Sequence, residues 1–296
     1  MKQLTVFTPT YNRAYCLHHC YESLKRQTCK DFVWLVIDDG STDNTRELVK
    51  RWQHEEELEI HYCWQENQGM HGAHNTAYQK IETELNVCID SDDYMPDDGV
   101  AKILYFWAVH GNEKVSGMAG LDADKEGNII GKPFPQGLMQ ATLFDVYYKH
   151  AVTGDKKLVY RTELTKKYPY PIFKDEKYVG LAYKYYMLDK DYELLLMNDV
   201  LCHVEYLADG SSLNMVRQYR KNPLGFSFYR KALMQLPFAN TTFKFRQAVH
   251  YVSSNLISKN KAFLQETPAK TLTTFAIPLG FLLYVYVASK TSKASS

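Results

Sequence analysis

The chain has 296 residues, of which 45% are hydrophobic and 23% are charged. This composition argues against a disordered protein, and the length allows a full core in one large domain or in one domain with an appendage. The net charge is only +1, yet residues 214–296 hold twelve Lys and Arg against one acid, a net of +11, which leaves −10 on residues 1–213. The basic C-terminal third predicts a partner with a negatively charged surface.

Apolar runs of strand length alternate with helical apolar spacing over residues 3–110. The expected order is strand 4–7, helix 14–27, strand 32–37, helix 43–53, strand 58–64, helix 73–84, strand 86–89 and helix 97–109. This alternation predicts an α/β fold with a mainly parallel, doubly wound sheet. Beyond Gly111 the pattern loosens into strands and turns, with one helix expected over residues 176–188.

Two acidic clusters directly follow predicted strands. They are Asp38-Asp39-Gly40-Ser41 and Asp90-Ser91-Asp92-Asp93. The carboxyl ends of parallel strands meet at one edge of a sheet, where α/β proteins bind their ligands. Carboxylates gathered there predict a site for a nucleotide and a divalent cation. The first cluster alone also fits a turn followed by a helix cap, but the second acidic strand end favours ligand binding.

The C-terminal region, residues 214–296, combines basic and aromatic residues in helical segments. Within it, Leu272 to Ala288 is nearly all apolar, although Pro278 and Gly280 interrupt the run. This run is slightly short for a membrane-spanning helix, so it predicts an interfacial or re-entrant segment beside anionic headgroups. The alternatives are a helix packed on the protein and a basic oligomer face.

The six cysteines form no Cys-x-x-Cys pair, and the N-terminus leads into a strand rather than an apolar signal segment. These features predict free thiols and a cytoplasmic protein. With the basic, apolar C-terminal segment, they predict a location at the inner face of the plasma membrane.

Six motifs within residues 3–110 carry a resemblance to a known family. They are Thr8-Pro9-Thr10-Tyr11-Asn12-Arg13, Gln27-Thr28, Ile37-Asp38-Asp39-Gly40-Ser41-Thr42-Asp43, Glu66-Asn67-Gln68-Gly69, His74-Asn75 and Asp90-Ser91-Asp92-Asp93. Through them the chain resembles the family 2 glycosyltransferases of the GT-A fold, an inverting group that includes many bacterial polysaccharide sugar transferases. The resemblance implies a Rossmann-like, mainly parallel sheet flanked by helices over residues 1–213, with a helical appendage at 214–296. Residues 1–110 are then the nucleotide-sugar half and 111–213 the acceptor half.

The resemblance assigns a metal site to the second acidic cluster. A nucleoside diphosphate sugar has a dianionic leaving group, which Mn²⁺ or Mg²⁺ neutralises when carboxylate oxygens hold the ion against the diphosphate. The metal candidates are Asp92 and Asp93. We favour Asp92 for the metal, with Asp93 as a second ligand or a helix cap.

The same resemblance implies a nucleotide pocket around both strand ends. In it, Tyr11 stacks on the base and the Asp39 carboxylate accepts a hydrogen bond from the N3–H of uracil or thymine. Glycines after the third strand allow a close approach of the backbone to a ligand. The complete set of nucleotide-binding candidates is Pro9, Tyr11, Arg13, Asp39, Asn67, Gly69, Asp90 and Ser91. His71 and His74 are further donor-site candidates, although a His at a helix start is more often structural.

Inversion requires a general base that takes the proton from the acceptor hydroxyl. In the family this base is a carboxylate at the start of a helix well downstream of the metal motif, a place that Asp175 and Glu176 fit. The usual Glu-Asp order is reversed here, and we favour Glu176. The alternative is a pair that caps a helix in solvent. Residues 206–212 are expected to form a loop that closes over the donor.

The resulting prediction is an inverting, metal-dependent and non-processive glycosyltransferase. It moves one sugar from a UDP- or dTDP-sugar to a glycan or lipid-linked acceptor in surface polysaccharide synthesis, because the Gln/Arg-x-x-Arg-Trp motif of processive synthases is absent. A peripheral membrane contact through residues 214–296 is expected, and no nucleic-acid partner. The alternatives are a metal-dependent nucleotidyltransferase or phosphodiesterase, and a non-catalytic module that binds a nucleotide sugar.

Overall fold

The computed structural model describes residues 2–205 and 215–292. These residues form two compact units: 2–68, 72–169 and 191–205 in the first, and 69–71, 170–190 and 215–292 in the second. The boundary expected at residue 213 and the loop expected at 206–212 lie outside the described residues. Residues 170–190, which the sequence places in the acceptor half, pack in the second unit with the C-terminal helices.

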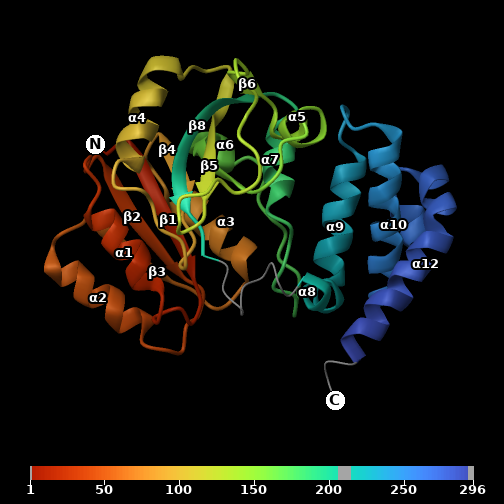
Figure 1. The fold of residues 1–296 in the computed structure, drawn as a ribbon. Coiled ribbons are helices and arrows are strands. Elements are labelled where there is room, and N and C mark those ends of the chain that lie inside the picture. The colour runs from red at the N-terminus through yellow and green to blue at the C-terminus, as the bar shows by residue number, and fades with distance from the viewer. Residues whose placement is uncertain (1, 206–214, 293–296) are drawn as a thin grey trace. The chain divides into compact units, whose positions relative to one another are not determined.

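The first unit is built on an eight-stranded sheet with helices on both faces (Figure 1). The strands are β1 Leu4–Thr10, β2 Phe32–Asp38, β3 Ile60–Trp64, β4 Leu85–Cys88, β5 Val115–Ala123, β6 Gln140–Ala141, β7 Lys156–Arg161 and β8 Glu193–His203. The helices in this part of the chain are α1 Leu17–Lys25, α2 Thr45–Glu55, α3 Met70–Lys80, α4 Gly99–His110, α5 Leu143–Tyr148 and α6 Thr162–Thr165. All eight elements expected over residues 3–110 are present within a few residues of their predicted limits.

The strand order is β3-β2-β1-β4-β7-β5-β8-β6. Neighbours among β3, β2, β1 and β4 are parallel, as are β5 and β8. β7 is antiparallel to both β4 and β5, and β6 is antiparallel to β8. Six strands therefore share one direction, which confirms the mainly parallel sheet, and β7 is inserted against that direction between β4 and β5.

Alternating side chains of β1 show how the two faces of the sheet are covered. Leu4 and Val6 belong to the main core with residues of α1, α2 and α4. Phe7 points to the other face, where its ring meets the rings of His74 and Tyr78 of α3 at centroid distances of 5.1 and 5.4 Å. Both faces of β1 are thus buried, as expected for a central parallel strand.

The second unit is helical in the residues described. Its helices are α7 Ala182–Leu188, α8 Met215–Lys221, α9 Pro223–Met234, α10 Thr241–Ile257, α11 Phe263–Glu266 and α12 Lys270–Ser292. The Asn240 side chain caps α10 by accepting the backbone N–H of Phe243 at 2.8 Å. Residues of α9, α10 and α12 share a small core, made of Met234, Ala248, Tyr251, Val252 and Ala276.

Two sequence expectations about helices are wrong. The helix expected from residue 176 begins only at Ala182, because Asp175 has a left-handed φ of 65° and Glu176 bonds to another helix. The C-terminal apolar run is not interrupted at Pro278 or Gly280, since α12 continues through both.

Candidate active site

Loops that follow β1, β2 and β4 leave the sheet at the same edge. Thr10 pairs with Asp38, and Asp38 pairs with Trp64, so these three strands end side by side. β4 ends at Cys88, and Asp90 follows two residues later. The structure thus brings the loops that bear the two acidic clusters to the carboxyl edge of the first unit, where α/β folds place ligands.

The loops after β1 and β2 are clasped to each other by hydrogen bonds. The backbone N–H of Asn12 donates to the Ser41 hydroxyl at 2.9 Å, and the Asn12 side chain accepts the N–H of Thr42 at 2.7 Å. The Asp43 carboxylate accepts the N–H of Ala14 at 3.0 Å. Asn12 itself has a φ of 53°, a left-handed conformation that Asn tolerates better than most residues. The clasp fixes the loop that carries the predicted nucleotide contacts.

Three predicted nucleotide contacts lie in or beside this loop. Pro9 is buried in β1 and pairs with Ile37 of β2. Its missing N–H leaves no gap in the ladder to β4, because that ladder ends at Phe7. Tyr11 is 49% exposed at the edge, as a stacking platform for a base requires. The guanidinium of Arg13, which is half-buried, donates to the Tyr15 hydroxyl.

The first acidic cluster has mainly local bonding partners. Asp38 is buried, and its carboxylate accepts from the Ser41 N–H at 2.8 Å and from the Tyr62 hydroxyl at 2.5 Å. Asp39 is also buried, and its Oδ1 accepts from the Gln68 N–H at 2.9 Å and the Gln65 amide at 2.6 Å. One oxygen of Asp39, predicted to bind the base, therefore holds the loop after β3 in place.

Glycines near that loop serve close approaches within the protein. Gly40 has a φ of +86°, and a Cβ there would come within 2.9 Å of the backbone N of Asn67. Asn67, a predicted nucleotide contact, thus packs against the first acidic loop. Gly69 has a φ of +82°, and a Cβ there would meet the carbonyl oxygen of Lys177 at 2.1 Å. Gly69 therefore permits a close approach to the backbone of Lys177. This contact within the protein explains the glycine without the expected approach to a ligand.

The second acidic cluster forms a tight turn after β4. The N–H of Asp93 donates to the Asp90 carbonyl at 3.0 Å, with Ser91 and Asp92 between them. Asp90 and Asp92 are half-buried, whereas Ser91 and Asp93 are buried. The following helix α4 begins at Gly99 with Asp98 in the capping position, so the expected role of Asp93 as a helix cap is wrong.

The Asp93 carboxylate points instead toward a buried lysine that the sequence analysis did not single out. Lys157, in β7, places its Nζ 3.7 Å from Oδ2 of Asp93, and both side chains are almost fully buried. Cys202 donates its thiol to the same oxygen at 3.7 Å. Asp122, near the end of β5, is 2% exposed and also acts electrostatically on Lys157. The buried ammonium group of Lys157 thus pairs with the acidic turn from inside the first unit.

The charges of this cluster are set by burial and by one another. Burial raises the pKa of Asp93 to about 7, against the opposing attraction of Lys157, and Asp90 and Asp92 add to the rise. Burial alone would lower the pKa of Lys157, but the surrounding acidic groups hold it well above its usual value. Lys157 therefore stays charged and compensates part of the negative charge of the turn.

The donor set suits a metal that shares its coordination with a substrate. Within residues 2–205 and 215–292, no three His, Cys, Asp or Glu side chains converge into a metal cage. Mg²⁺ and Mn²⁺ in nucleotide sites commonly take one or two carboxylates and complete their shell with phosphate oxygens and water. Because Asp93 is committed to Lys157, the half-buried Asp92 and Asp90 are the carboxylates that fit such an ion.

His203 is a further polar group beside the acidic turn that the sequence analysis missed. It ends β8, exchanges backbone hydrogen bonds with Tyr94, and stacks on the Tyr94 ring at 4.9 Å. Its Nδ1 lies 3.0 Å from the Asp124 carbonyl oxygen, which can only accept a hydrogen bond, so Nδ1 carries a proton. A backbone carbonyl on the other ring nitrogen is the usual support of a metal-binding imidazole.

Buried polar atoms without a partner also gather at this edge. In the described part of the chain they include the Thr10 hydroxyl at the end of β1, Oε1 of Gln65 just after β3, and Oδ1 of Asp122 near the end of β5. Buried polar groups are nearly always hydrogen-bonded in native proteins. Three such exceptions at or near the carboxyl ends of three strands support a ligand site there.

Comparison with known proteins decides the family. The profile of Glycosyl transferase family 2 matches residues 5–168, more than half of the chain. This protein belongs to glycosyl transferase family 2. The expected resemblance is thereby confirmed.

Curated relatives of this family 2 protein are bacterial. Glycosyltransferase GlyA of Streptococcus pneumoniae is 36% identical over 98 residues, which are 33% of this chain and 14% of the relative. The GalNAc(5)-diNAcBac-PP-undecaprenol beta-1,3-glucosyltransferase of Campylobacter jejuni is 27% identical over 163 residues, which are 50% of this chain and 52% of the relative. The chain thus matches about half or less of the length of these relatives.

Solved structures confirm the GT-A fold expected for the family. Staphylococcus aureus TarS 1–349 in complex with UDP-GlcNAc superposes with a TM-score of 0.63 at 17% identity, covering 99% of this chain and 92% of that one. The mannosyltransferase PcManGT of Pyrobaculum calidifontis in complex with GDP-Man and Mn²⁺ gives a TM-score of 0.56 at 20% identity, covering 96% and 87%. At these identities the likeness shows the fold alone.

The candidate general bases of the family 2 protein lie in the second unit. Glu176 is buried, and its two oxygens accept the backbone N–H groups of Leu224 and Gly225 at 2.9 and 2.8 Å, in the first turn of α9. Burial raises the pKa of Glu176, against the lowering effect of these two bonds. Asp175, in contrast, is exposed and held in a left-handed conformation. Glu176 therefore acts as an anchor for a helix N-terminus.

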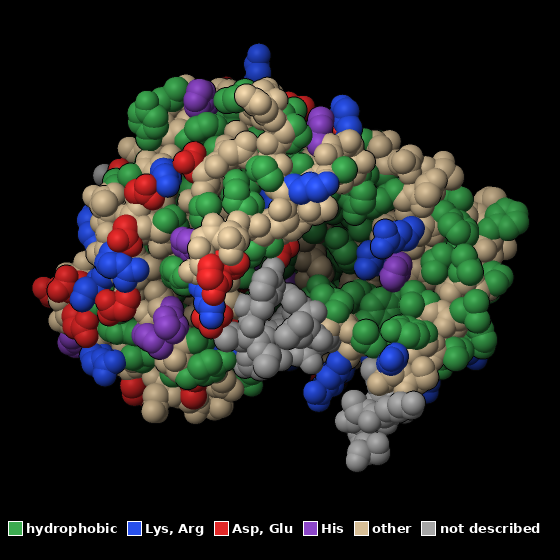
Figure 2. Space-filling model, viewed as in Figure 1, with side chains coloured by type: hydrophobic (Ala, Val, Ile, Leu, Met, Phe, Trp, Pro, Cys, Tyr) green, Lys and Arg blue, Asp and Glu red, His purple; other side chains and the backbone are tan. Residues whose placement is uncertain are grey.

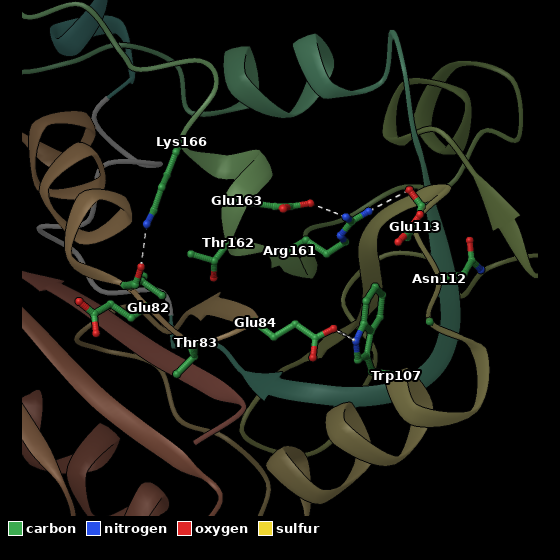
Figure 3. A pocket seen from close by; sticks show the side chains of 12 residues that line it. Glu82, Thr83, Glu84, Trp107, Asn112, Glu113, Arg161, Thr162, Glu163 and Lys166 are labelled. Carbon is green, nitrogen blue, oxygen red and sulfur yellow. Dashed lines mark hydrogen bonds and ion pairs between the residues drawn. The ribbon is translucent and has the colours of Figure 1, made fainter. Parts of the chain in front are cut away.

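Two hollows of the first unit differ in their position. One, of about 630 Å³, lies where β4 begins and β7 ends, opposite the acidic turns (Figure 3). Several of its polar side chains bond to one another or to nearby carbonyls, as Trp107 does with Glu84 at 2.7 Å and Lys166 with the Ile81 carbonyl at 3.0 Å. The other, of about 700 Å³, lies beside Leu121 of β5 and is lined largely by residues 129–137 and 150–152. The second hollow lies in the half of the chain expected to bind the acceptor.

Proposed function

We propose that this protein is an inverting, metal-dependent and non-processive glycosyltransferase. It transfers one sugar from a UDP- or dTDP-sugar to a glycan or lipid-linked acceptor in the synthesis of a bacterial surface polysaccharide. The observation that carries the proposal is the acidic turn Asp90–Asp93 at the carboxyl edge of the sheet, in a chain that belongs to family 2. Membership of the family makes a sugar nucleotide the natural ligand of that edge.

Related proteins support the classes of donor and acceptor. TarS was solved with UDP-GlcNAc, and the Campylobacter jejuni relative is named for an undecaprenol-linked acceptor. Chondroitin synthase of Escherichia coli is another relative, 28% identical over 127 residues. The ligand and the names of these relatives thus include a nucleotide-sugar donor and a glycan or lipid-linked acceptor, which are the classes that we propose here.

A divalent ion fits the half-buried carboxylates of the turn. Asp92 would hold it, with the half-buried Asp90 as a further carboxylate of suitable chemistry in the same turn. Bound there, the ion would supply charge neutralisation of the leaving diphosphate. Because the Asp93 carboxylate pairs with Lys157, Asp93 would not bind the ion. The positive charge of Lys157 also offsets part of the negative charge of the turn, which reduces its repulsion of the diphosphate that would bind with the ion.

The remaining residues of the edge bind and orient the donor. Tyr11 offers an exposed ring for stacking of the base, and the clasp between Asn12 and Thr42 holds that ring in position before the ligand arrives. A fixed loop reduces the conformational entropy that binding must remove. For the proton of the acceptor hydroxyl, we choose Asp175 as the base, because both oxygens of Glu176 already accept hydrogen bonds.

Substitution of each carboxylate separates these two roles. Asp175→Asn should lower kcat by about 10² to 10⁴ with the melting temperature unchanged, because it removes a general base from an exposed position. Glu176→Gln should lower the free energy of unfolding by about 1–3 kcal/mol, since the amide cannot accept both N–H groups of α9. Steady-state kinetics and thermal unfolding of both variants measure this split. Loss of turnover in Glu176→Gln at full stability would return the base to Glu176.

Ligand-dependent melting and product analysis test the proposed reaction. UDP or dTDP with Mn²⁺ should raise the melting temperature by about 5 °C at a hundredfold excess over the dissociation constant, and neither partner alone should do so. A transferase releases nucleoside diphosphate only when an acceptor is added. Release of nucleoside monophosphate or of sugar phosphate would instead indicate a phosphodiesterase or a nucleotidyltransferase. Binding without any turnover would indicate a non-catalytic module.

A further inference from the structure

The helix α12 exposes a row of large apolar side chains. Phe275 is 72% exposed, Leu279 48%, Leu282 62% and Tyr286 50%, and their spacing puts all four on one side of the helix. We call these four residues the outer stripe of α12. Figure 2 shows hydrophobic side chains gathered over the C-terminal helices, with Lys and Arg nearby. An apolar surface of this kind on a soluble unit marks an interaction site.

The opposite side of α12 is already used for packing. Thr273, Ala276, Gly280 and Val287 are buried, and α12 packs along α10. At Gly280 the helices are so close that a Cβ would come within 2.5 Å of Val252 of α10. The helix therefore has two apolar faces, one covered by its own unit and one, the outer stripe, that its own unit leaves open.

Basic groups flank the outer stripe and indicate what covers it. Lys270 and Lys290 lie near the two ends of α12, and no charged residue lies between them. The guanidinium of Arg220 donates to the Ala288 carbonyl at 3.5 Å, so it lies beside the last turns of the helix. With a net charge of +11 over residues 214–296, the surroundings are complementary to anionic lipid headgroups.

We propose that the outer stripe of α12 lies in the interfacial layer of an anionic membrane, with the helix parallel to the membrane surface. The stripe enters the boundary between headgroups and acyl chains, and the flanking Lys and Arg stay among the phosphates. This inference goes beyond the proposed sugar transfer and does not depend on it, because it concerns only the second unit and a lipid surface.

By length and composition alone, α12 is also able to cross a bilayer. It is the one helix among the described residues that passes this test, with 21 apolar-rich residues from Lys270 to Lys290. The packing of α12 on α10 opposes such a crossing, because α10 would have to enter the lipid together with α12. α10 carries Lys244, Arg246 and His250, which are costly to place in a bilayer core. Pro278 also leaves the Thr274 carbonyl without its helical donor, a group that water can reach at an interface but not in the bilayer core.

A second copy of the chain is the other apolar occupant to consider. Two copies that met through their outer stripes would bring two strongly basic surfaces together, and like charges at an interface oppose association. An anionic membrane satisfies both the apolar stripe and the basic flanks. The charge of the region therefore favours lipid over self-association.

Vesicle co-sedimentation with a matched pair of variants tests the inference. The test variant is Phe275→Glu/Leu279→Glu on the outer stripe. The control is Tyr105→Glu/Val109→Glu on α4 of the first unit, where the two side chains have the same spacing and are 74% and 56% exposed. On vesicles of equimolar phosphatidylglycerol and phosphatidylcholine, the test variant should lose at least about tenfold in partitioning, whereas the control should match the unsubstituted chain. Both should melt at the unsubstituted temperature, because all four positions are exposed.

Four outcomes would overturn the proposal. The first is an equal loss of vesicle binding in both variants, and the second is equal binding of the unsubstituted chain to pure phosphatidylcholine vesicles. The third is bound protein that resists extraction with alkaline carbonate, which indicates a spanning helix. The fourth is a dimer of the unsubstituted chain that is lost in the test variant and kept in the control. Release by high salt together with selective loss in the test variant would support it. Because vesicle binding is measured without donor or acceptor, failure of this test leaves the proposed transferase activity standing, and failure of the activity leaves this test unaffected.

Discussion

Asp92→Asn should lower kcat/KM for sugar transfer by at least about 10³, while the melting temperature changes little. The carboxylate is half-buried in the turn after β4, where we propose that it holds a divalent ion against a diphosphate. Neutralisation of a leaving diphosphate by a metal contributes several kcal/mol to the stabilisation of the transition state, which corresponds to a rate factor of this size. Initial rates over a range of donor concentrations and a titration of Mn²⁺ measure the loss.

A matched control for this change is Asp97→Asn. Asp97 lies five residues further along, is largely exposed, and pairs with the exposed Arg26 at 3.0 Å, an interaction of little energetic consequence. It should keep full activity and the same Mn²⁺ requirement. If Asp92→Asn retained turnover at ordinary Mn²⁺ concentrations, Asp92 would not be the metal ligand and the assignment of the acidic turn would have to be abandoned.

The sheet and the acidic turns were predictable because their signals are local. The strand β2 is an unbroken apolar run, β1 and β4 are short segments with apolar residues at their centres, and the clusters that begin at Asp38 and Asp90 come where β2 and β4 end. Parallel connection then brings both clusters to one edge, whatever the details of packing. Local sequence was therefore sufficient for the fold class and for the position of the candidate site.

The partners of these side chains were not predictable, because they come from distant segments. Lys157 lies 64 residues beyond Asp93, on a strand whose antiparallel insertion between β4 and β5 has no local signature. Two adjacent lysines that begin a strand and precede the apolar Leu158 and Val159 were an available signal, since Lys is seldom buried. For the same reason the bonds between Glu176 and α9 were missed, because they join residues 48 and 49 positions apart.

Lys157→Met should lower the free energy of unfolding by about 3–5 kcal/mol. Breaking a buried ion pair leaves an uncompensated buried charge, which is far more costly than the net contribution of the intact pair. Here the ammonium group is the internal cation for Asp93 and for the buried Asp122, whose Oδ1 has no hydrogen-bond partner in the described structure. Chemical denaturation of the purified variant measures the loss, and a value near zero would show that Lys157 does not compensate these carboxylates.

Two further measurements separate this electrostatic effect from a mere packing defect. The double variant Lys157→Met/Asp93→Asn should lose clearly less than the sum of the two single changes, because removing both partners leaves no unpaired charge between them. The deficit of Lys157→Met should also shrink as the pH falls through the raised pKa of Asp93 in the variant, which lies above about 7, and it should level off once Asp93 is protonated in both proteins. Burial already raises the pKa of Asp93 to about 7 in the native protein, and loss of Lys157 raises it further, so the folded variant gains a proton that the unfolded chain does not yet bind. Stability of the variant relative to the unsubstituted chain is thus greatest at low pH and is lost as the pH rises through the raised pKa, whereas a deficit independent of pH would point to packing alone.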